Sequence, residues 1–512
     1  AKHSVGDWNA SLSLGHNLES ARSKATTWYG RNFIDPTFPS INNTQETDRT
    51  VSQSATIRRI VGVFGDLSLD WRKIAFLNFR GRNDWSSTLP VNDRSFFYPA
   101  VGGSLIVTDL LQQMGLTDGS DRIISFGKIR ATWARVGKDA PPHVLRTTLF
   151  TVTNSFTIAP RGFISNVENF FGNPELKPEF TNSFEAGIEA RFLRGRLGVD
   201  ASYYNMVSYN QILLTRTPPS TSTFLAYLNG GSIDNRGVEL ILNAVPVRTG
   251  SFTWSVDLNW ARNKSTVKSL PGVLDRIELS DASMVNSVAQ GAAFLNGSLF
   301  GINGNVWRRN DQGQLLLSDA GYPLLAPLLH SIGDRNPDWF GGITNMLTYK
   351  NLSLSFMWDL RQGGDVYNAT ENFLVQAGQS TETLNRGQTV VFDGVIESTG
   401  ETNTKSVELS QDYYEAIYPN NGPAFVEDGS WVRLRYATLN YSLPTKILGK
   451  SPISGLQLFV TGRNLLLFTP YSGVDPEVTS GGAGVGGGGT FGMDNMGVPA
   501  TRGVDMGLKI SL

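Results

Sequence analysis

Alternation of apolar and polar residues constrains the fold of this chain more than any other feature of its sequence. In residues 252–260, and again in residues 504–512, apolar side chains occupy every second position. A period of two predicts strands with two different faces, whereas helical patterns are scarce and strongest at residues 109–114. About fourteen segments alternate in this way, each near the 9–11 residues with which a tilted strand crosses a membrane. Their approximate centres are Leu12, Val61, Leu77, Gly103, Ala131, Ile188, Ala201, Leu240, Val256, Thr344, Leu354, Leu434, Leu458 and Leu508.

The alternation changes phase in one of the last segments. Val432 and Leu434 occupy one set of alternate positions, and Leu439 and Tyr441 occupy the other. One extra residue in a strand produces such a change, so we predict a β-bulge near Ala437 and Thr438.

The connections between these segments alternate between long and short. Residues 263–337 and 362–428 are very long connections, whereas residues 246–251 and 349–351 are short or tight. Residues 107–126 are the exception, because they are longer than the other connections of the short set. Long loops on one side and short turns on the other are the rule for outer-membrane β-barrels, whose closure pairs the backbone groups that lipid cannot. We therefore predict an all-β fold: an antiparallel transmembrane β-barrel in the bacterial outer membrane, with long extracellular loops and short periplasmic turns.

The composition agrees with a membrane barrel and excludes several other classes of protein. Charged residues make up 17% of the chain, against roughly 25% in soluble proteins, and no stretch approaches the roughly 18 apolar residues of a membrane-spanning helix. The absence of Cys excludes disulfides and thiolate metal sites. A formal net charge of −1 gives no basic surface, so nucleic acid is not an expected partner. Tryptophans at strand ends, such as Trp8 and Trp431, predict an aromatic girdle, with ordinary core packing as the alternative.

No pattern predicts catalysis or a bound cofactor. Glu185 and Glu189 fall on one strand face, where a polar lumen lining explains them better than a glycosidase pair. The sequence contains no nucleophile elbow and no phosphate-binding Walker loop. The four histidines lack metal-ligand spacing; they are His3, His16, His143 and His330. We expect no enzymatic activity, no metal and no cofactor.

Seven short motifs occur along the chain in an order that resembles one family of proteins. They are residues 82–87 (RNDWSS), 173–179 (NPELKPE), 229–239 (NGGSIDNRGVE), 332–337 (IGDRNP), 426–434 (VEDGSWVRL), 462–465 (GRNL) and 471–477 (YSGVDPE). Each is weak alone, since Gly, Asn and Pro are ordinary turn residues. Together they resemble the SusC/RagA family of TonB-dependent transporters of the Bacteroidetes outer membrane, although Trp85 stands where that family usually has Gly.

The resemblance implies more structure than this sequence contains. Members of the family have an N-terminal extension, a TonB-contacting segment, a plug domain and a barrel of 22 strands. We find no plug pattern and about fourteen strands of a probable 22-strand barrel. We therefore expect residues 1–512 to be the C-terminal part of such a barrel, with the plug, the extension and the remaining strands supplied elsewhere.

The same resemblance implies a function and a set of partners. We expect an active importer of oligosaccharides or peptides that contacts the lipid bilayer, works with a SusD-like surface lipoprotein as its lid and receives energy from the TonB complex through the plug. A dimer of SusC–SusD pairs is a further possibility. Candidate substrate-binding residues are aromatic residues of the two longest loops: Trp307, Tyr322, Tyr367, Tyr413 and Tyr414. Packing within the loops, or contact with the lid, is the alternative for each residue and the one we favour.

Three other functions stay open at this point. One is a TonB-dependent siderophore or vitamin receptor, which would lack a lipoprotein lid. Another is a passive porin or structural outer-membrane component, in which this chain closes by itself. The last is a secreted β-rich adhesin or glycanase, which would be soluble without detergent.

Overall fold

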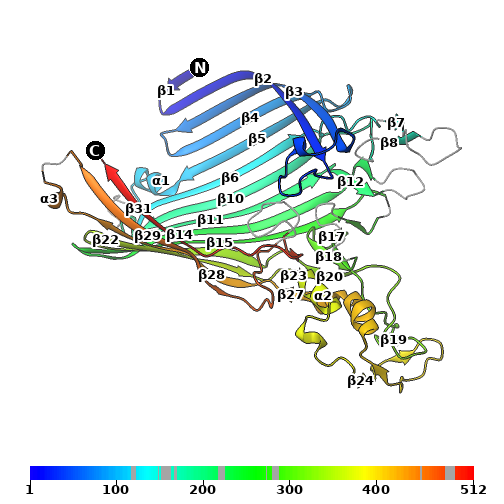
Figure 1. The fold of residues 1–512 in the computed structure, drawn as a ribbon. Helices are drawn as coiled ribbons and strands as arrows, with labels where there is room; N and C mark the ends of the chain where they lie inside the picture. Colours follow the sequence, from blue (N-terminus) through cyan, green and yellow to red (C-terminus); the bar gives the residue numbers. More distant parts are fainter. Residues whose placement is uncertain are drawn as a thin grey trace. The chain divides into compact units, whose positions relative to one another are not determined.

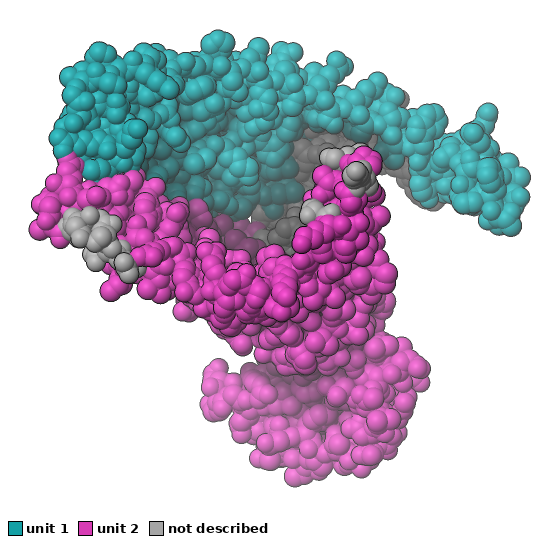
Figure 2. Space-filling model, turned by 90° about the vertical axis from the view of Figure 1, so that its left-hand side faces the viewer, with its two compact units in different colours: residues 1–103, 132–183, 208–231 teal, residues 104–131, 184–207, 232–512 magenta. Residues whose placement is uncertain are grey.

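A computed structural model of the chain describes residues 1–116, 123–147, 149–151, 163–165, 170–216, 225–272, 274–278, 287–449, 452–478 and 491–511. The chain forms two compact units, which Figure 2 shows in different colours. Unit 1 contains Ala1–Gly103, Thr132–Ser183 and Ser208–Gly231, and unit 2 contains Ser104–Ala131, Phe184–Val207 and Ser232–Leu512.

The main element is one sheet of 15 strands, in which neighbours in space follow one another along the sheet in chain order (Figure 1). Its strands are β1 (Lys2–Val5), β2 (Trp8–Gly30), β3 (Arg49–Trp71), β4 (Ala75–Ser86), β5 (Ser95–Ile106), β6 (Ile124–Lys138), β10 (Glu179–Phe192), β11 (Leu197–Tyr209), β14 (Ser232–Arg248), β15 (Phe252–Ser269), β21 (Trp339–Tyr349), β22 (Leu352–Gln362), β28 (Trp431–Ser442), β29 (Gly455–Phe468) and β31 (Gly503–Ser511). Every predicted strand centre lies in one of them. The sequence pattern missed the short strand β1, which pairs with the start of β2.

The two faces of the sheet differ in polarity, as the alternation predicts. Across β22, β28, β29 and β31, one row of directly paired residues is apolar and largely exposed, and it consists of Leu354, Leu439, Val460 and Met506. The next row faces the other side and is polar, and it consists of Ser355, Thr438, Thr461 and Asp505. Exposed apolar side chains on one face are what a strand presents to lipid.

Connections of different length gather at different ends of unit 2. Tight turns join β14 to β15 and β21 to β22, and α1 (Val107–Gln113) and α3 (Thr445–Leu448) lie at that same end (Figure 1). The helix predicted at residues 109–114 is therefore confirmed, and it accounts for the one connection that broke the length rule. The long connections after β15 and β22 lie at the opposite end with α2 (Ala369–Gln376). In the described residues, no helix is both long and apolar enough to cross a membrane.

The predicted β-bulge exists, but the prediction of its position was wrong. Against β22, the register shifts between Leu434 and Tyr436, which makes Arg435 the extra residue of β28 in that pair. Against β29 the register shifts at the same place, but the extra residue is on β29. The apolar pattern placed the shift near Ala437 and Thr438 because Tyr436 was counted among the outward residues. Tyr436 in fact pairs with Met357, one position out of phase with the outward Trp358–Leu434 pair.

The long connections contain smaller sheets and short helices. The strands are β7 (Leu149–Thr151), β8 (Phe163–Ser165), β9 (Phe170–Phe171), β12 (Ile212–Arg216), β13 (Leu225–Asn229), β16 (Arg276–Glu278), β17 (Ala289–Phe294), β18 (Gly301–Gly304), β19 (Leu316–Leu317), β20 (His330–Asp334), β23 (Asp365–Asn368), β24 (Thr389–Val390), β25 (Val395–Ile396), β26 (Val407–Glu408), β27 (Val426–Asp428) and β30 (Met493–Asp494). The single-turn helices are η1 (Ile41–Asn43), η2 (Glu46–Asp48), η5 (Thr381–Thr383), η6 (Tyr413–Ile417), η7 (Tyr418–Asn420) and η8 (Gly422–Phe425).

Candidate functional site

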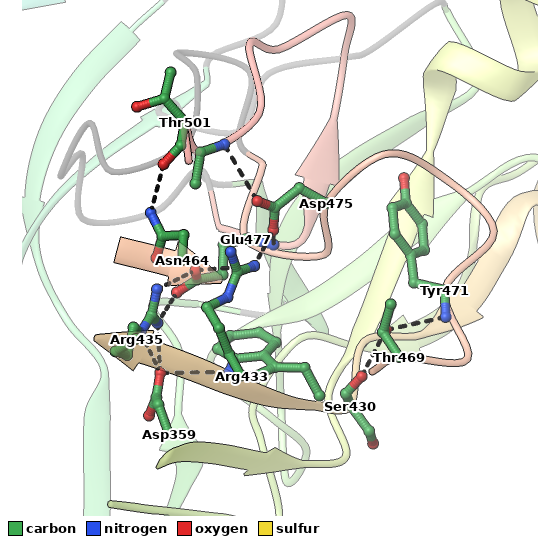
Figure 3. Close-up of polar contacts among 12 residues, drawn as sticks. Asp359, Ser430, Arg433, Arg435, Asn464, Thr469, Tyr471, Asp475, Glu477 and Thr501 are labelled. Carbon is green, nitrogen blue, oxygen red and sulfur yellow. Dashed lines mark hydrogen bonds and ion pairs between the residues drawn. The ribbon is translucent and has the colours of Figure 1, made fainter. Parts of the chain in front are cut away.

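Two motifs near the end of the chain, residues 426–434 and 471–477, meet in one ion network, drawn in Figure 3. Arg433 of β28 contacts Asp475 at 2.5 Å (Nη2–Oδ1) and Glu477 at 3.2 Å (Nη2–Oε2). The side chains of Arg433 and Asp475 are each only 3% exposed. Because a charge buried this deeply costs several kcal/mol unless it is paired, the two motifs depend on each other for stability.

The β-bulge brings a second arginine into the same network. Arg435 contacts Glu477 at 2.5 Å (Nη2–Oε1) and also pairs with Asp359 of β22. Glu477 is therefore shared by two arginines of one strand (Figure 3). The network joins the neighbouring strands β22 and β28 to the loop that follows β29. Bulges commonly redirect a side chain in this way.

The Asp-Gly-Ser turn before β28 fixes the start of that strand. Asp428 Oδ1 accepts hydrogen bonds from Ser430 N and Oγ at 2.9 and 2.5 Å. Ser430 Oγ in turn accepts one from Gly363 N at 2.8 Å. A Cβ on Gly429 would lie 2.6 Å from the carbonyl oxygen of Gly364, so this position admits no side chain without a backbone shift. Close approach of two backbone segments explains the Gly of the motif.

Further hydrogen bonds hold the loop after β29 together and attach it to the end of the loop between β22 and β28. Tyr471 Oη donates to Asp494 Oδ2 at 2.6 Å. Burial, and then the hydrogen bond to Asp494, raise the pKa of Tyr471 well above its ordinary value, so the phenol stays neutral. Glu427 accepts from Ser472 Oγ and from Asn368 Nδ2, each at 2.8 Å. Segments distant in sequence thus form one folded region.

The five aromatic residues predicted as substrate contacts lie in this loop region of unit 2. Tyr367, Tyr413 and Tyr414 belong to a hydrophobic cluster and are 0%, 5% and 6% exposed. The ring of Tyr413 lies between those of Tyr322 and Tyr418, with centroids 6.4 and 5.9 Å away. Burial raises the pKa of Tyr413, which therefore stays uncharged in the cluster.

These positions revise the expectation for individual residues. Tyr367, with no exposed surface, packs inside the cluster and cannot touch a ligand in this conformation. Tyr413 is almost as deeply buried. The Tyr322 hydroxyl donates to the carbonyl oxygen of Glu408 at 2.9 Å. These contacts fit loop packing, the alternative given for each of the three residues, and substrate binding by them stays a prediction. Trp307 and Tyr414 differ, because each also lines a surface cleft.

Within the described part of the loop region, Trp307 and Tyr414 each line a cleft. The Trp307 cleft has a volume of about 660 Å³ and is lined by Val306, Trp307, Arg308, Arg309, Ala326, Pro327, His330, Asn421 and Pro423. The Tyr414 cleft has a volume of about 390 Å³, and its lining includes Gly378, Arg386, Glu408, Tyr414 and Glu415. Both volumes lie in the usual range for small-ligand sites. The sequence prediction included one residue of each cleft and missed the charged residues beside them.

The motif residues of unit 1 also contact one another. Lys177 N donates to Asn229 Oδ1 at 2.7 Å, and Asn229 Nδ2 donates back to the Lys177 carbonyl at 2.9 Å. Leu176, next to Lys177 in the motif of residues 173–179, is fully buried in a cluster with Leu89, Phe96 and Val144. The motifs of residues 173–179 and 229–239 therefore hold two loops of unit 1 together.

Asp139, just after β6, accepts hydrogen bonds from three side chains of unit 1. Arg58 donates to both of its carboxylate oxygens, at 2.8 and 2.9 Å, and Thr88 Oγ1 donates at 2.9 Å. Ser86 of the first motif donates to it as well. Burial alone would raise the pKa of Asp139, but these hydrogen bonds outweigh burial and hold the pKa below its usual value.

This lowered pKa predicts how stability depends on pH. A carboxyl group whose pKa is lower in the folded state stabilises that state above the unfolded pKa, about 3.9, and the contribution disappears as the pH falls through the folded value. Asp139→Asn is therefore expected to reduce the free energy of unfolding by about 2 kcal/mol at pH 7 and by much less below pH 3. Urea unfolding of both proteins at the two pH values measures this difference. A gap between the two proteins that stays constant over this range would contradict the assignment.

The sheet, with one apolar exposed face and long loops at one end, defines a membrane β-barrel protein of the outer-membrane class. Comparison with known families agrees: residues 3–465 match the family described as TonB dependent receptor-like, beta-barrel. The chain belongs to this family, whose members lie in the outer membrane of bacteria.

Individual relatives carry the family name, and this chain aligns with about half of the length of each. TonB-dependent receptor P26 of Formosa agariphila is 27% identical over 506 residues, covering 93% of this chain and 48% of the relative. TonB-dependent receptor SusC of Bacteroides thetaiotaomicron is 25% identical over 457 residues, covering 83% of this chain and 42% of the relative. The solved RagAB peptide importer in its open-open state has the same fold, with a TM-score of 0.76 at 18% identity, over 100% of this chain and 53% of that one. The chain thus spans about half the length of the proteins that it matches.

Proposed function

We propose that this chain is part of an outer-membrane importer of oligosaccharides or peptides that works with TonB and a SusD-like lipoprotein lid. The observation that carries the proposal is the match to SusC and to the RagAB fold, joined to a loop region that contains two clefts. As a transporter, the protein would move its substrate without chemical change.

The same comparison supports a proposal about partners. We propose that the plug and the remaining barrel strands of the working transporter come from polypeptide outside residues 1–512, since relatives are about twice as long. TonB would act through that plug, and the lid would rest on the extracellular loops. A dimer of transporter–lid pairs is part of the proposal.

The experiment is an uptake measurement with the full-length transporter in its own outer membrane. Fluorescent oligosaccharides and peptides are offered to cells with and without TonB, and the transporter is purified to identify what remains bound. We expect uptake that disappears without TonB, and a surface lipoprotein that co-purifies. Uptake that persists without TonB would indicate a passive pore, and TonB-dependent uptake of a metal chelate without any lipoprotein would indicate a siderophore receptor.

The lipid-facing row predicts a large difference between two adjacent residues. Val460, near the middle of β29, is 43% exposed on the apolar face, whereas Thr461 bonds Thr438 on the polar face at 2.9 Å. Val460→Arg is expected to lower the free energy of unfolding in lipid vesicles by about 2–4 kcal/mol, because it places a charge in hydrocarbon. Thr461→Arg is the matched control and is expected to cost less, since its side chain faces the polar side. Equal costs would contradict the orientation of the sheet.

A further inference from the structure

The ionisable residues that line the Trp307 cleft are all basic. Its ionisable residues are Arg308, Arg309 and His330, and its lining contains no carboxylate. Arg308 is neutralised by an ion pair with Glu397, outside the lining. In the described part of the chain no carboxylate lies within ion-pair distance of Arg309, whose Nη1 donates to the Gly313 carbonyl at 2.8 Å. A guanidinium group has five donors, so Arg309 keeps donors for a ligand.

Apart from Asn421, the other residues that line the cleft are apolar. Two contacts fix the Trp307 side chain. Its Nε1 donates to the Ile417 carbonyl at 3.3 Å. Its ring packs nearly edge to face with that of Phe392, with the ring centroids 6.0 Å apart. Pro327 and Pro423 extend the apolar surface. A fixed indole beside a cationic group provides both a stacking surface for a ring and a partner for an acid.

Several backbone groups of residues 306–308 are already hydrogen-bonded. Arg308 N donates to the Leu324 carbonyl at 2.7 Å, and the carbonyls of Val306 and Arg308 accept from Ala326 N and Leu316 N at 3.0 and 2.9 Å. Peptides are commonly recognised by adding a strand to a free edge, and these bonds already occupy three backbone groups of residues 306–308. We therefore take side chains as the main means of recognition here, which favours a compact ring with a charged substituent over an extended peptide.

We propose that the Trp307 cleft binds an acidic oligosaccharide, with a sugar ring on Trp307 and a uronate carboxylate at Arg309 and His330. The proposal deepens the proposed import function, on which it rests, by naming the class of substrate. Among the predicted aromatic residues, Trp307 then has a ligand-binding role, and His330 gains one that its sequence position did not indicate.

Calorimetric titration of the purified full-length transporter tests the proposal, with trigalacturonate, maltotriose and triglutamate as probes. We expect trigalacturonate to bind at least tenfold more tightly than maltotriose. Arg309→Gln should weaken trigalacturonate binding about tenfold or more, because hydrogen bonds to charged groups contribute about 1.5–3 kcal/mol. His330→Gln should also weaken it, because the imidazole can donate a hydrogen bond to the carboxylate.

The control is Arg386→Gln, which removes a cation from the Tyr414 cleft instead and should leave the affinity unchanged. Equal binding of trigalacturonate and maltotriose, or an unchanged affinity in Arg309→Gln, would overturn the proposal. Triglutamate binding as tight as trigalacturonate would show a peptide or charge-only site and would overturn it as well. Titration does not depend on transport, so a failure of this site is distinguishable from a failure of import, which the uptake measurement reports.

Discussion

Arg433→Met is expected to lower the free energy of unfolding by about 3–5 kcal/mol, because it leaves the buried carboxylate of Asp475 without its cation. Urea unfolding of the full-length protein in lipid vesicles measures the loss. The double variant Arg433→Met/Asp475→Asn should recover part of it, since the second change removes the unpaired charge. The partial recovery separates the loss of a charge pair from a simple loss of packing.

Arg463→Met provides the matched control. Arg463 pairs with Asp505 at 2.6 Å, but the two side chains are 64% and 47% exposed. Exposed pairs contribute about 0–1 kcal/mol, so this variant should stay within that range. If the two arginine variants lose the same stability, burial of the Arg433 network is not what makes it important.

Tyr413→Ala is expected to destabilise the loop region by about 3–5 kcal/mol, as for other large aromatic residues removed from a core. Tyr413 contacts the rings of Tyr322, Phe392, Tyr414 and Tyr418, so its loss opens a cavity at the centre of the cluster. Amide hydrogen exchange in residues 363–430 should accelerate a hundredfold or more, since each 1.4 kcal/mol corresponds to about a factor of ten.

The exchange of the main sheet should change little in the same experiment, because its strands are paired independently of this cluster. Leu384→Ala, at a position 76% exposed, is the control and should leave exchange in the loop region unchanged. Uniform acceleration over loops and sheet would show that the loop core and the sheet unfold as one unit, contrary to this expectation.

The strands could be predicted from sequence because their physical requirement is periodic. A strand between lipid and a polar interior must alternate, and rows such as Leu354–Leu439–Val460 and Ser355–Thr438–Thr461 show that requirement directly. The bulge at Arg435 shows the limit of the method. A single extra residue is visible as a change of phase, but Tyr436 is amphipathic enough to fit either face.

The loop region could not be predicted in the same way. Its core joins Ile302, Tyr367, Tyr413 and Met493, residues far apart in sequence that share no period. Sequence analysis identified large aromatic residues in long loops but could not decide between packing and binding, because both uses require the same side chains. The ion network was partly visible as motifs, yet nothing in the spacing of Arg433 and Asp475 indicated that they form a buried pair.

The ion network also has a mechanical consequence. Asp475 and Glu477 hold the loop after β29 to two arginines of β28, while Ser472 and Asp494 of the same loop hold it to Glu427 and Thr370. A force applied to this loop is therefore shared by several charged contacts in parallel, and none of them yields alone. Any displacement of the loop must either carry the attached segments with it as a single body or break the whole set of contacts at once.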